Sequence, residues 1–487
     1  MEHWITVLPG KRNIPAKAGE TLLDALRRHG LAPDAPCGGT GKCGKCTVLV
    51  GGQPVLACRT VICRDLTVTL PQKAAPQVLA QGIKTHTAPG QEGYLLCVDI
   101  GTTTVACCLL DGGTGVELAQ ASAANPQRAF GADVVSRIRA ALGGQQDVLT
   151  QSIRDCLTCL TEQVCQKAAV YPEEIRVVSI VANTCMQQLF LGISPKNLSQ
   201  IPFTPVLTEA KAVPAAPYLP LFQNAQLLIV PDISGFVGAD TVGCLLATRL
   251  YEAEETTLLV DIGTNGEMVL GDREKLVCCA AAAGPALEGA NISCGMPAAP
   301  GAIDRVWLEK GKLCCHVIGD VPATGICGSG LIDAVAAALD GGLLNRRGRI
   351  LDPAERNGQR FLPLTDTLSL TQEDIRQVQL AKGAIAAGIE LMAAELDIPL
   401  RKIGQVLLAG AFGSYLNPES ACRIGLIPAV LAGKAQPIGN AALSGAKCLA
   451  CDPRLLETAQ TLARQVRPLN LAQLPEFSKC FARNTGF

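Results

Sequence analysis

Four cysteines near the start of the chain have the spacing of a metal-cluster site. Five residues separate Cys37 from Cys43, two separate Cys43 from Cys46, and eleven separate Cys46 from Cys58. Glycines lie between the first three, and glycine lets the backbone wrap closely around a cluster because it carries no Cβ. Four thiolates in such a loop are the ligand set of an iron–sulfur cluster. Structural zinc is the alternative, but zinc sites commonly use two separated C-x2-C pairs.

A repeated motif indicates phosphate binding. The sequence VDIGT occurs at 98–102 and again at 260–264, each time after an apolar, strand-like run. Glycine lets backbone N–H groups approach phosphate oxygens, threonine and asparagine add donors, and aspartate holds Mg²⁺, usually through water. The repeat predicts two phosphate loops from a duplicated half-domain. A pair of ordinary β-turns is the alternative interpretation.

Composition narrows the class of protein. Hydrophobic residues make up 48% of the 487 residues and charged residues 17%, which is typical of packed domains and not of disorder. The formal net charge of −1 gives no reason to expect binding to nucleic acid or to a membrane surface. We expect no transmembrane helix and no signal peptide. The 23 cysteines then favour a reducing cytoplasm, with the thiols outside the loop buried as small apolar groups.

The motifs must be positioned by separate folding units. Residues 1–72 are predicted to form one unit, with strands at 4–8, 47–50 and 66–70 and a helix at 20–29. A linker rich in proline and glycine is expected at 73–93. Strands then alternate with helices, which predicts an α/β architecture with half-domains at 94–255 and 256–487. Residues 371–396 are predicted to form a long helix that starts with a capping box.

The first unit resembles the β-grasp ferredoxins, which carry a [2Fe–2S] cluster. The plant-type spacing is C-x4-C-x2-C, and the longer x5 form is similar to that of the adrenodoxin branch. The gap before the fourth cysteine is shorter here than in those families. Because the Leu-Ala-Cys context at 56–58 matches the family's fourth ligand, the resemblance implies Cys58 as that ligand, with Cys63 as the rival. The implied ligand set is Cys37, Cys43, Cys46 and Cys58.

The repeated motif resembles the superfamily of actin, hexokinase and the heat-shock chaperone ATPases. Its members clamp ATP with Mg²⁺ between two duplicated, ribonuclease H-like half-domains. The resemblance implies Mg²⁺-linked carboxylates at Asp99 and Asp261, and a glycine turn after 406–409 looks like the superfamily's adenosine motif. Residues 325–330 either approach the nucleotide or turn the chain. The implied nucleotide contacts are Gly101, Thr102, Thr103, Thr104, Gly263, Thr264, Asn265, Gly410, Ala411 and Gly413.

Together, the order of these units resembles the reductive activators of corrinoid proteins, and stretches at 125–137, 284–289 and 410–413 support the match. The resemblance implies ATP-dependent one-electron reduction of a Co(II) corrinoid protein to Co(I). The electron would come from an unidentified low-potential donor. Whether the protein forms a homodimer is left open. Glu267 and Asp240 are candidates for positioning the attacking water. Two alternatives stay open: an activator of another low-potential enzyme, and a small-molecule kinase with a redox-sensing ferredoxin domain.

Overall fold

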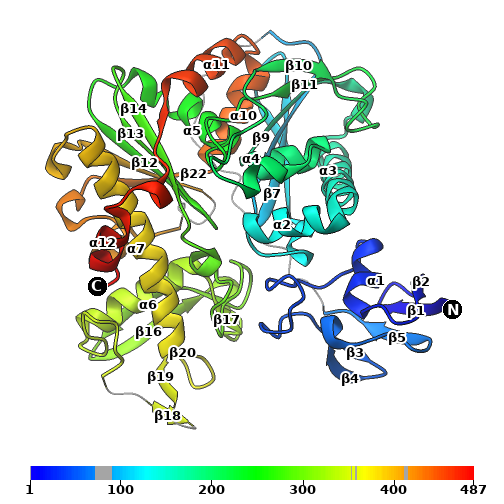
Figure 1. The fold of residues 1–487 in the computed structure, drawn as a ribbon, viewed down its shortest axis with the longest axis horizontal. Helices are drawn as coiled ribbons and strands as arrows, with labels where there is room; N and C mark the ends of the chain where they lie inside the picture. The colour runs from blue at the N-terminus through cyan, green and yellow to red at the C-terminus, as the bar shows by residue number, and fades with distance from the viewer. Residues whose placement is uncertain (1, 72–89, 352–353, 357–358, 411–414) are drawn as a thin grey trace.

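A computed structural model describes residues 2–71, 90–351, 354–356, 359–410 and 415–487. Figure 1 shows a small N-terminal domain, in blue, beside a larger body that consists of two lobes. None of the helices in the described ranges is long and apolar enough to cross a membrane.

The N-terminal domain is a mixed sheet crossed by one short helix. Strand β1 pairs antiparallel with β2 and parallel with β5. The helix α1 (Leu22–Arg28) buries Leu22, Leu23 and Leu26 against the sheet, and Thr21 caps it by accepting a hydrogen bond from Asp24 N–H. The predicted helix therefore begins after its cap and not at residue 20. The strands, in sheet order, are β2 (Arg12–Lys17), β1 (Glu2–Leu8), β5 (Leu66–Thr69), β3 (Thr47–Val50) and β4 (Gln53–Leu56).

The first lobe has a mixed sheet whose centre carries the first copy of the repeated motif. Strand β6 pairs antiparallel with β7 and parallel with β9. The helices α2 (Val134–Ala140), α3 (Gln146–Ala168) and α4 (Thr184–Leu191) accompany this sheet. In sheet order the strands are β10 (Lys211–Pro214), β11 (Gln226–Ile229), β9 (Ile175–Ala182), β6 (Tyr94–Ile100), β7 (Thr104–Asp111) and β8 (Glu117–Ala124).

The second lobe repeats that topology. Strand β12, which carries the second motif, pairs antiparallel with β13 and parallel with β21, as β6 pairs with β7 and β9. The predicted duplication and the predicted β-grasp plus actin-like fold are therefore confirmed. In sheet order the strands are β22 (Ala435–Gly439), β21 (Gln405–Ala409), β12 (Thr257–Ile262), β13 (Gly266–Gly271), β14 (Leu276–Ala281) and β23 (Arg467–Pro468).

Smaller elements complete the second lobe. The predicted long helix is α7 (Gln372–Glu395), and its capping box between Thr371 and Asp374 is present. The 325–330 stretch turns the chain from β17 (Gly325–Ile326) into α6 (Gly328–Asp340). The remaining elements are β15 (Ala302–Glu309), β16 (Lys312–Val317), β18 (Ala354–Arg356), β19 (Gln359–Pro363), β20 (Ser369–Thr371), α9 (Pro418–Arg423), α11 (Leu455–Gln465) and α12 (Phe477–Asn484).

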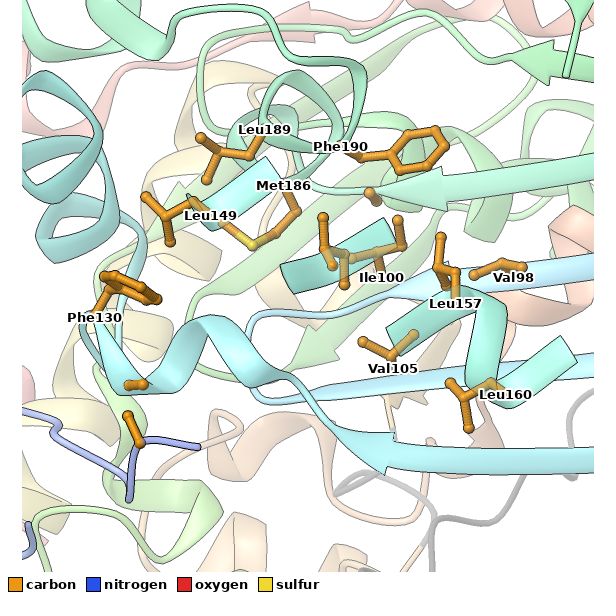
Figure 2. Close-up of a cluster of buried hydrophobic side chains, with 14 of the residues drawn as sticks. Val98, Ile100, Val105, Phe130, Leu149, Leu157, Leu160, Met186, Leu189 and Phe190 are labelled. Atoms are coloured by element: carbon orange, nitrogen blue, oxygen red, sulfur yellow. The ribbon is translucent and has the colours of Figure 1, made fainter. Parts of the chain in front are cut away.

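The core of the first lobe surrounds the buried side chains at the end of β6. Figure 2 shows Val98 and Ile100 packed with side chains from the neighbouring helices, and Phe130 at one edge of the cluster. Ile100 and Leu149 are fully buried, and Phe130 is 3% exposed. The strand that delivers the first phosphate loop is therefore held by a packed apolar layer.

Two helices meet between the lobes. The helix α5 (Ala239–Thr248) ends the first lobe, and α10 (Ala441–Cys451) follows the sheet of the second. They share one buried apolar cluster with both sheets, and a Cβ placed on Gly445 would lie 2.1 Å from the carbonyl oxygen of Gly243. The helices therefore touch backbone to backbone, which only glycine permits.

The Gly445→Ala substitution tests this helix crossing. The added methyl group must push α5 and α10 apart, so we expect a loss of about 1–3 kcal/mol of unfolding free energy, as for other overpacked sites. Gly143→Ala is the matched control, because a Cβ there would meet no atom within 4 Å. Urea unfolding followed by circular dichroism compares the two variants, and equal midpoints would contradict the crossing.

Candidate functional site

The two copies of the repeated motif face each other across a cavity of about 100 Å³ between the lobes. The structure brings nearly all of the predicted nucleotide residues to this cavity. Ala411 and Gly413 lie outside the described residues. The lining residues that were predicted from sequence are Asp99, Gly101, Thr102, Thr103, Thr104, Asp261, Gly263, Thr264, Asn265 and Gly410.

The ends of β6 and β12 position the two loops. Each strand turns directly into an antiparallel partner, so the loop between them is short and its backbone faces the cavity. A Cβ on Gly101 would lie 2.7 Å from the Thr104 carbonyl oxygen, so this turn requires glycine. Gly410 follows β21 with φ at +93°, and a Cβ there would lie 2.6 Å from Asp261 Oδ1. Gly101 is thus required by the backbone of its own turn, and Gly410 by the neighbouring Asp261 side chain.

Several carboxyl groups line the cavity. Burial and the nearby Asp240 raise the pKa of Asp261 to about 7. Burial also raises the pKa of Asp99 to about 7, although Asn440 Nδ2 donates to Asp99 Oδ2 over 2.8 Å. Burial raises the pKa of Asp240 to about 6 and that of Glu267 well above its usual value. Such a group of oxygens has the composition that Mg²⁺ selects in proteins.

Glu288 connects the two loops and was not identified as a functional residue from the sequence. Thr103 Oγ1 donates to Glu288 Oε2 over 2.7 Å and lies 3.1 Å from Thr264 Oγ1. Thr264 Oγ1 also donates to the same carboxylate. The only sequence signal was the 284–289 stretch, whose resemblance to a family gave no role to the glutamate. These hydroxyl groups are the donors that a phosphate group requires.

Asparagines that cap helices also reach the phosphate loops. Asn183 caps α4 and donates through Nδ2 to Thr102 Oγ1 over 2.9 Å. Asn440 caps α10 and contacts Asp99. Nothing in the local sequence distinguishes these asparagines from ordinary helix caps, and the sequence analysis did not identify them.

The four loop cysteines form two pairs in the N-terminal domain. The sulfur atoms of Cys37 and Cys43 are 3.2 Å apart, and those of Cys46 and Cys58 are 3.3 Å apart. The hairpin of β3 and β4 runs directly between Cys46 and Cys58, and it brings them together across a short stretch of sequence. The rival fourth ligand, Cys63, is exposed. Two thiol pairs suit two metal ions bridged by sulfide, which is the ligand arrangement of a [2Fe–2S] cluster.

The loop backbone favours a bound cluster. Gly38, Gly39, Gly41 and Gly44 all have φ between +67° and +94°, which side chains disfavour. Burial raises the pKa of Cys37, but hydrogen bonds from the Thr40 side chain and from backbone N–H groups outweigh it and lower the pKa to about 5. Burial and the adjacent Cys46 raise the pKa of Cys58 to about 11, and metal binding removes such a proton.

The remaining cysteines follow the expectation only in part. All 23 are free thiols, and many of them, such as the 107–108 and 278–279 pairs, are buried. The expectation of buried apolar thiols is wrong for Cys63 and Cys159, which are exposed. It is met only in part where the thiols are half-buried, at Cys156, Cys294, Cys314, Cys315 and Cys448. In the described part of the chain, no three His, Cys, Asp or Glu side chains converge to hold a single metal ion.

Three known domain families match consecutive parts of the chain. Residues 5–63 match the 2Fe-2S iron-sulfur cluster binding domain. Residues 94–253 match the RACo middle region, and residues 255–487 match the C-terminal domain of RACo, the ASKHA domain. The first match supports a [2Fe–2S] cluster, and the last supports nucleotide binding.

Known relatives share most of the chain. The corrinoid activation enzyme RamQ of Eubacterium limosum is 34% identical over 418 residues, which cover 81% of this chain and 70% of that protein. The [Co(II) methylated amine-specific corrinoid protein] reductase of Methanosarcina barkeri is 32% identical over 285 residues, covering 54% of this chain and 51% of the relative. A solved structure, the reductive activator for corrinoid, iron-sulfur protein, covers 100% of this chain and 98% of its own, with a TM-score of 0.74 and 27% identity. The chain belongs to the family of reductive activators of corrinoid proteins.

Proposed function

We propose that this chain uses ATP to pass one electron from a [2Fe–2S] cluster to a corrinoid protein in its inactive Co(II) form, which restores Co(I). The observation that carries the proposal is that one chain joins a loop of paired thiols to a two-lobed phosphate site. A reductase of a Co(II) corrinoid protein and a corrinoid activation enzyme are among its relatives.

The energetics explain why such a protein needs a nucleotide. A plant-type [2Fe–2S] cluster has a reduction potential of about −400 mV, and the Co(II)/Co(I) step commonly lies lower. Moving one electron uphill by about 100 mV takes about 2.3 kcal/mol. A nucleotide that binds one conformation of the complex more tightly than another shifts the electron-transfer equilibrium by that difference in binding free energy.

Within this proposal, the paired thiols hold the cluster, which supplies the one-electron chemistry. The two loops at 101–104 and 263–265 bind phosphate oxygens through backbone N–H groups and threonine hydroxyls. Asp99 and Asp261 hold Mg²⁺, and the adenosine lies near Gly410. Glu267 and Asp240 both line the phosphate cavity, but which of them positions the attacking water stays a prediction.

The space at the site suits a nucleotide only if the phosphate cavity opens further. Ligand sites commonly have about 300–1,000 Å³, whereas the phosphate cavity has about 100 Å³. A second cavity of about 870 Å³ shares Thr264 and Asn265 with it. A change in the separation of the lobes would join the two spaces.

Other parts of the proposal concern the cell and the partners. Free thiols throughout the chain fit a reducing cytoplasm. The electron donor is a low-potential carrier that remains to be identified, and gel filtration of the cluster-loaded protein will decide between monomer and homodimer.

The function is tested by anaerobic reconstitution. We expect the cluster-loaded chain, given a chemical reductant, to convert a Co(II) corrinoid protein to Co(I) only when Mg²⁺ and ATP are present. The cobalt spectrum in the visible range follows the reaction, and a non-hydrolysable nucleotide is the control. Reduction at the full rate without ATP would contradict the proposal.

Replacement of one cysteine at a time tests the thiol ligands. Serine at 37, 43, 46 or 58 should lower the bound iron and bleach the visible spectrum, because one of the two irons then loses a thiolate. Cys63→Ser is the matched control, since its thiol is exposed, and it should keep full iron content. Loss of iron in the Cys63 variant, with retention in the Cys58 variant, would reverse the assignment of the fourth ligand.

Asp99→Asn and Asp261→Asn should lower Mg²⁺-dependent ATP hydrolysis by about 100-fold or more, since each removes a carboxylate from the proposed cation site. Both should also stabilise the nucleotide-free protein by about 1–2 kcal/mol near pH 8, because the buried charge is lost. Each carboxyl group has a pKa of about 7 in the folded protein, above its ordinary value of 3.8. The wild-type protein is therefore most stable below pH 4, where the group is protonated in both states, and it loses this stability as the pH rises through 7. The stability that the asparagine variants gain over the wild type should therefore be smaller at pH 5, where the wild-type carboxyl groups are mostly protonated.

Calorimetry at the two pH values measures this difference in stability. Asp155→Asn, on the exposed face of α3, is the control and should change neither the hydrolysis rate nor its pH dependence. If the variants hydrolyse ATP at the normal rate, Asp99 and Asp261 do not hold the cation.

A further inference from the structure

The stretch at 125–137, which we term the bridge segment, forms hydrogen bonds with the first phosphate loop. Asn125 N–H donates to Thr103 O over 2.9 Å, and Asn125 Nδ2 donates to Gly101 O over 2.8 Å. The Arg137 guanidinium donates to the carbonyl oxygen of Thr102. Three consecutive carbonyl groups of the phosphate loop are therefore held by the two ends of the bridge segment.

Arg137 links the interior of the bridge segment to the same loop. Its side chain is fully buried, and Nε donates to Gly131 O over 3.2 Å. Burial lowers the pKa of Arg137 to about 10, so the guanidinium stays charged at neutral pH. Because one rigid guanidinium bonds both Gly131 and Thr102, a displacement of the phosphate loop displaces the bridge segment.

The middle of the bridge segment contacts the N-terminal domain through Arg27. The Arg27 Nε and Nη2 atoms donate to Ala129 O over 2.8 and 2.6 Å, and Nη2 also donates to Gly38 O over 3.1 Å. Its guanidinium carbon lies 5.1 Å from the centroid of the Phe130 ring. One side chain thus holds both the cysteine loop and the bridge segment.

Three further polar contacts join the N-terminal domain to the bridge segment, beside an apolar part in which Ala35 and Phe130 belong to one buried cluster. Ala35 N–H donates to Arg128 O over 3.4 Å, and Ala132 N–H donates to Pro36 O over 3.3 Å. Arg128 and Asp34 form an ion pair of 2.8 Å. Both backbone hydrogen bonds are longer than usual, so a modest change on either side can open this docking.

A nucleotide acts on the other end of the same chain of contacts. The Thr103 and Thr264 hydroxyls donate to Glu288. A phosphate group competes for these hydroxyls and repels the carboxylate, so its binding must separate Thr103 from Glu288. The carbonyl group of Thr103 is bonded to Asn125, and the bridge segment must follow. The docked geometry therefore belongs to the arrangement in which Glu288 holds both threonines.

We propose that Arg27 is a positioning residue that docks the cysteine loop on the bridge segment, and that nucleotide binding at the phosphate loops weakens this docking so that the loop can reach its partner. The proposal deepens the proposed function and rests on it for the identity of the nucleotide and the partner.

Hydrogen exchange measured by mass spectrometry tests the docking without any corrinoid protein. The amides of Ala35 and Ala132 donate across the interface, so their exchange reports its opening. In the cluster-loaded wild-type chain, we expect Mg²⁺ and a non-hydrolysable ATP analogue to speed exchange of both amides by at least fivefold. In Arg27→Ala, exchange should be fast with and without nucleotide. Unchanged protection and response in this variant would overturn the proposal.

Matched variants separate geometry from charge. Arg27→Lys keeps the charge but cannot make the forked contacts with two carbonyl groups, so it should behave like Arg27→Ala while the reduction potential of the cluster stays unchanged. Arg28→Ala is the control, because Arg28 pairs with Glu20 inside the N-terminal domain, and it should behave like the wild type. If the Ala35 and Ala132 amides stay fully protected from exchange in Arg27→Lys, the positive charge alone is sufficient for docking, and the positioning role is overturned.

The positioning role and the proposed function fail in different ways. Iron content and the visible spectrum are measured first. If the Arg27 variants lose iron, Phe130→Leu replaces them; it removes only the ring beside the guanidinium, so a smaller loss of protection in the same direction is expected. If wild-type protein reduces Co(II) without ATP, the proposed function fails whatever the exchange data show. If reduction needs ATP but exchange of the Ala35 and Ala132 amides in the wild type does not respond to the nucleotide, only the positioning role is overturned.

Discussion

The burial of four carboxyl groups around one small cavity is the constraint on which the interior of this molecule depends. Asp99, Asp240, Asp261 and Glu267 lie around one small cavity, and each has a raised pKa because burial disfavours its charge. A fold keeps such a group only if the surrounding packing holds it in place. The sheets, the helix caps and the close glycine turns supply that packing, and a divalent cation has its strongest attraction at this point.

The duplicated fold explains how so many polar groups meet at one point. Strands β6 and β12 occupy equivalent central positions in their sheets, and each ends in a tight turn toward the other lobe. Helix caps from α4 and α10 then add amide groups from the ends of neighbouring elements. The cysteine loop uses the same device on a smaller scale, because a hairpin returns Cys58 to Cys46.

Much of this arrangement could be predicted from sequence because its signals are local. The repeated VDIGT motif, the capping box at Thr371 and the glycine-rich cysteine loop each depend on residues close together in the chain. Glu288, Asn440 and Arg27 could not be identified this way, since their roles arise from contacts with residues 102 to 341 positions away. The exposure of Cys159 was missed for a similar reason, because burial of a helix face depends on what packs against it.

The helix crossing at Gly243 and Gly445 has a mechanical consequence. Helices that pack through large side chains resist rotation, because rows of side chains on one helix fit between rows on the other and must be displaced first. At this crossing the two backbones lie against each other without a side chain between them. The lobes can therefore pivot about this point while disturbing little of the apolar packing around it, and the width of the cleft becomes a soft degree of freedom in an otherwise rigid body.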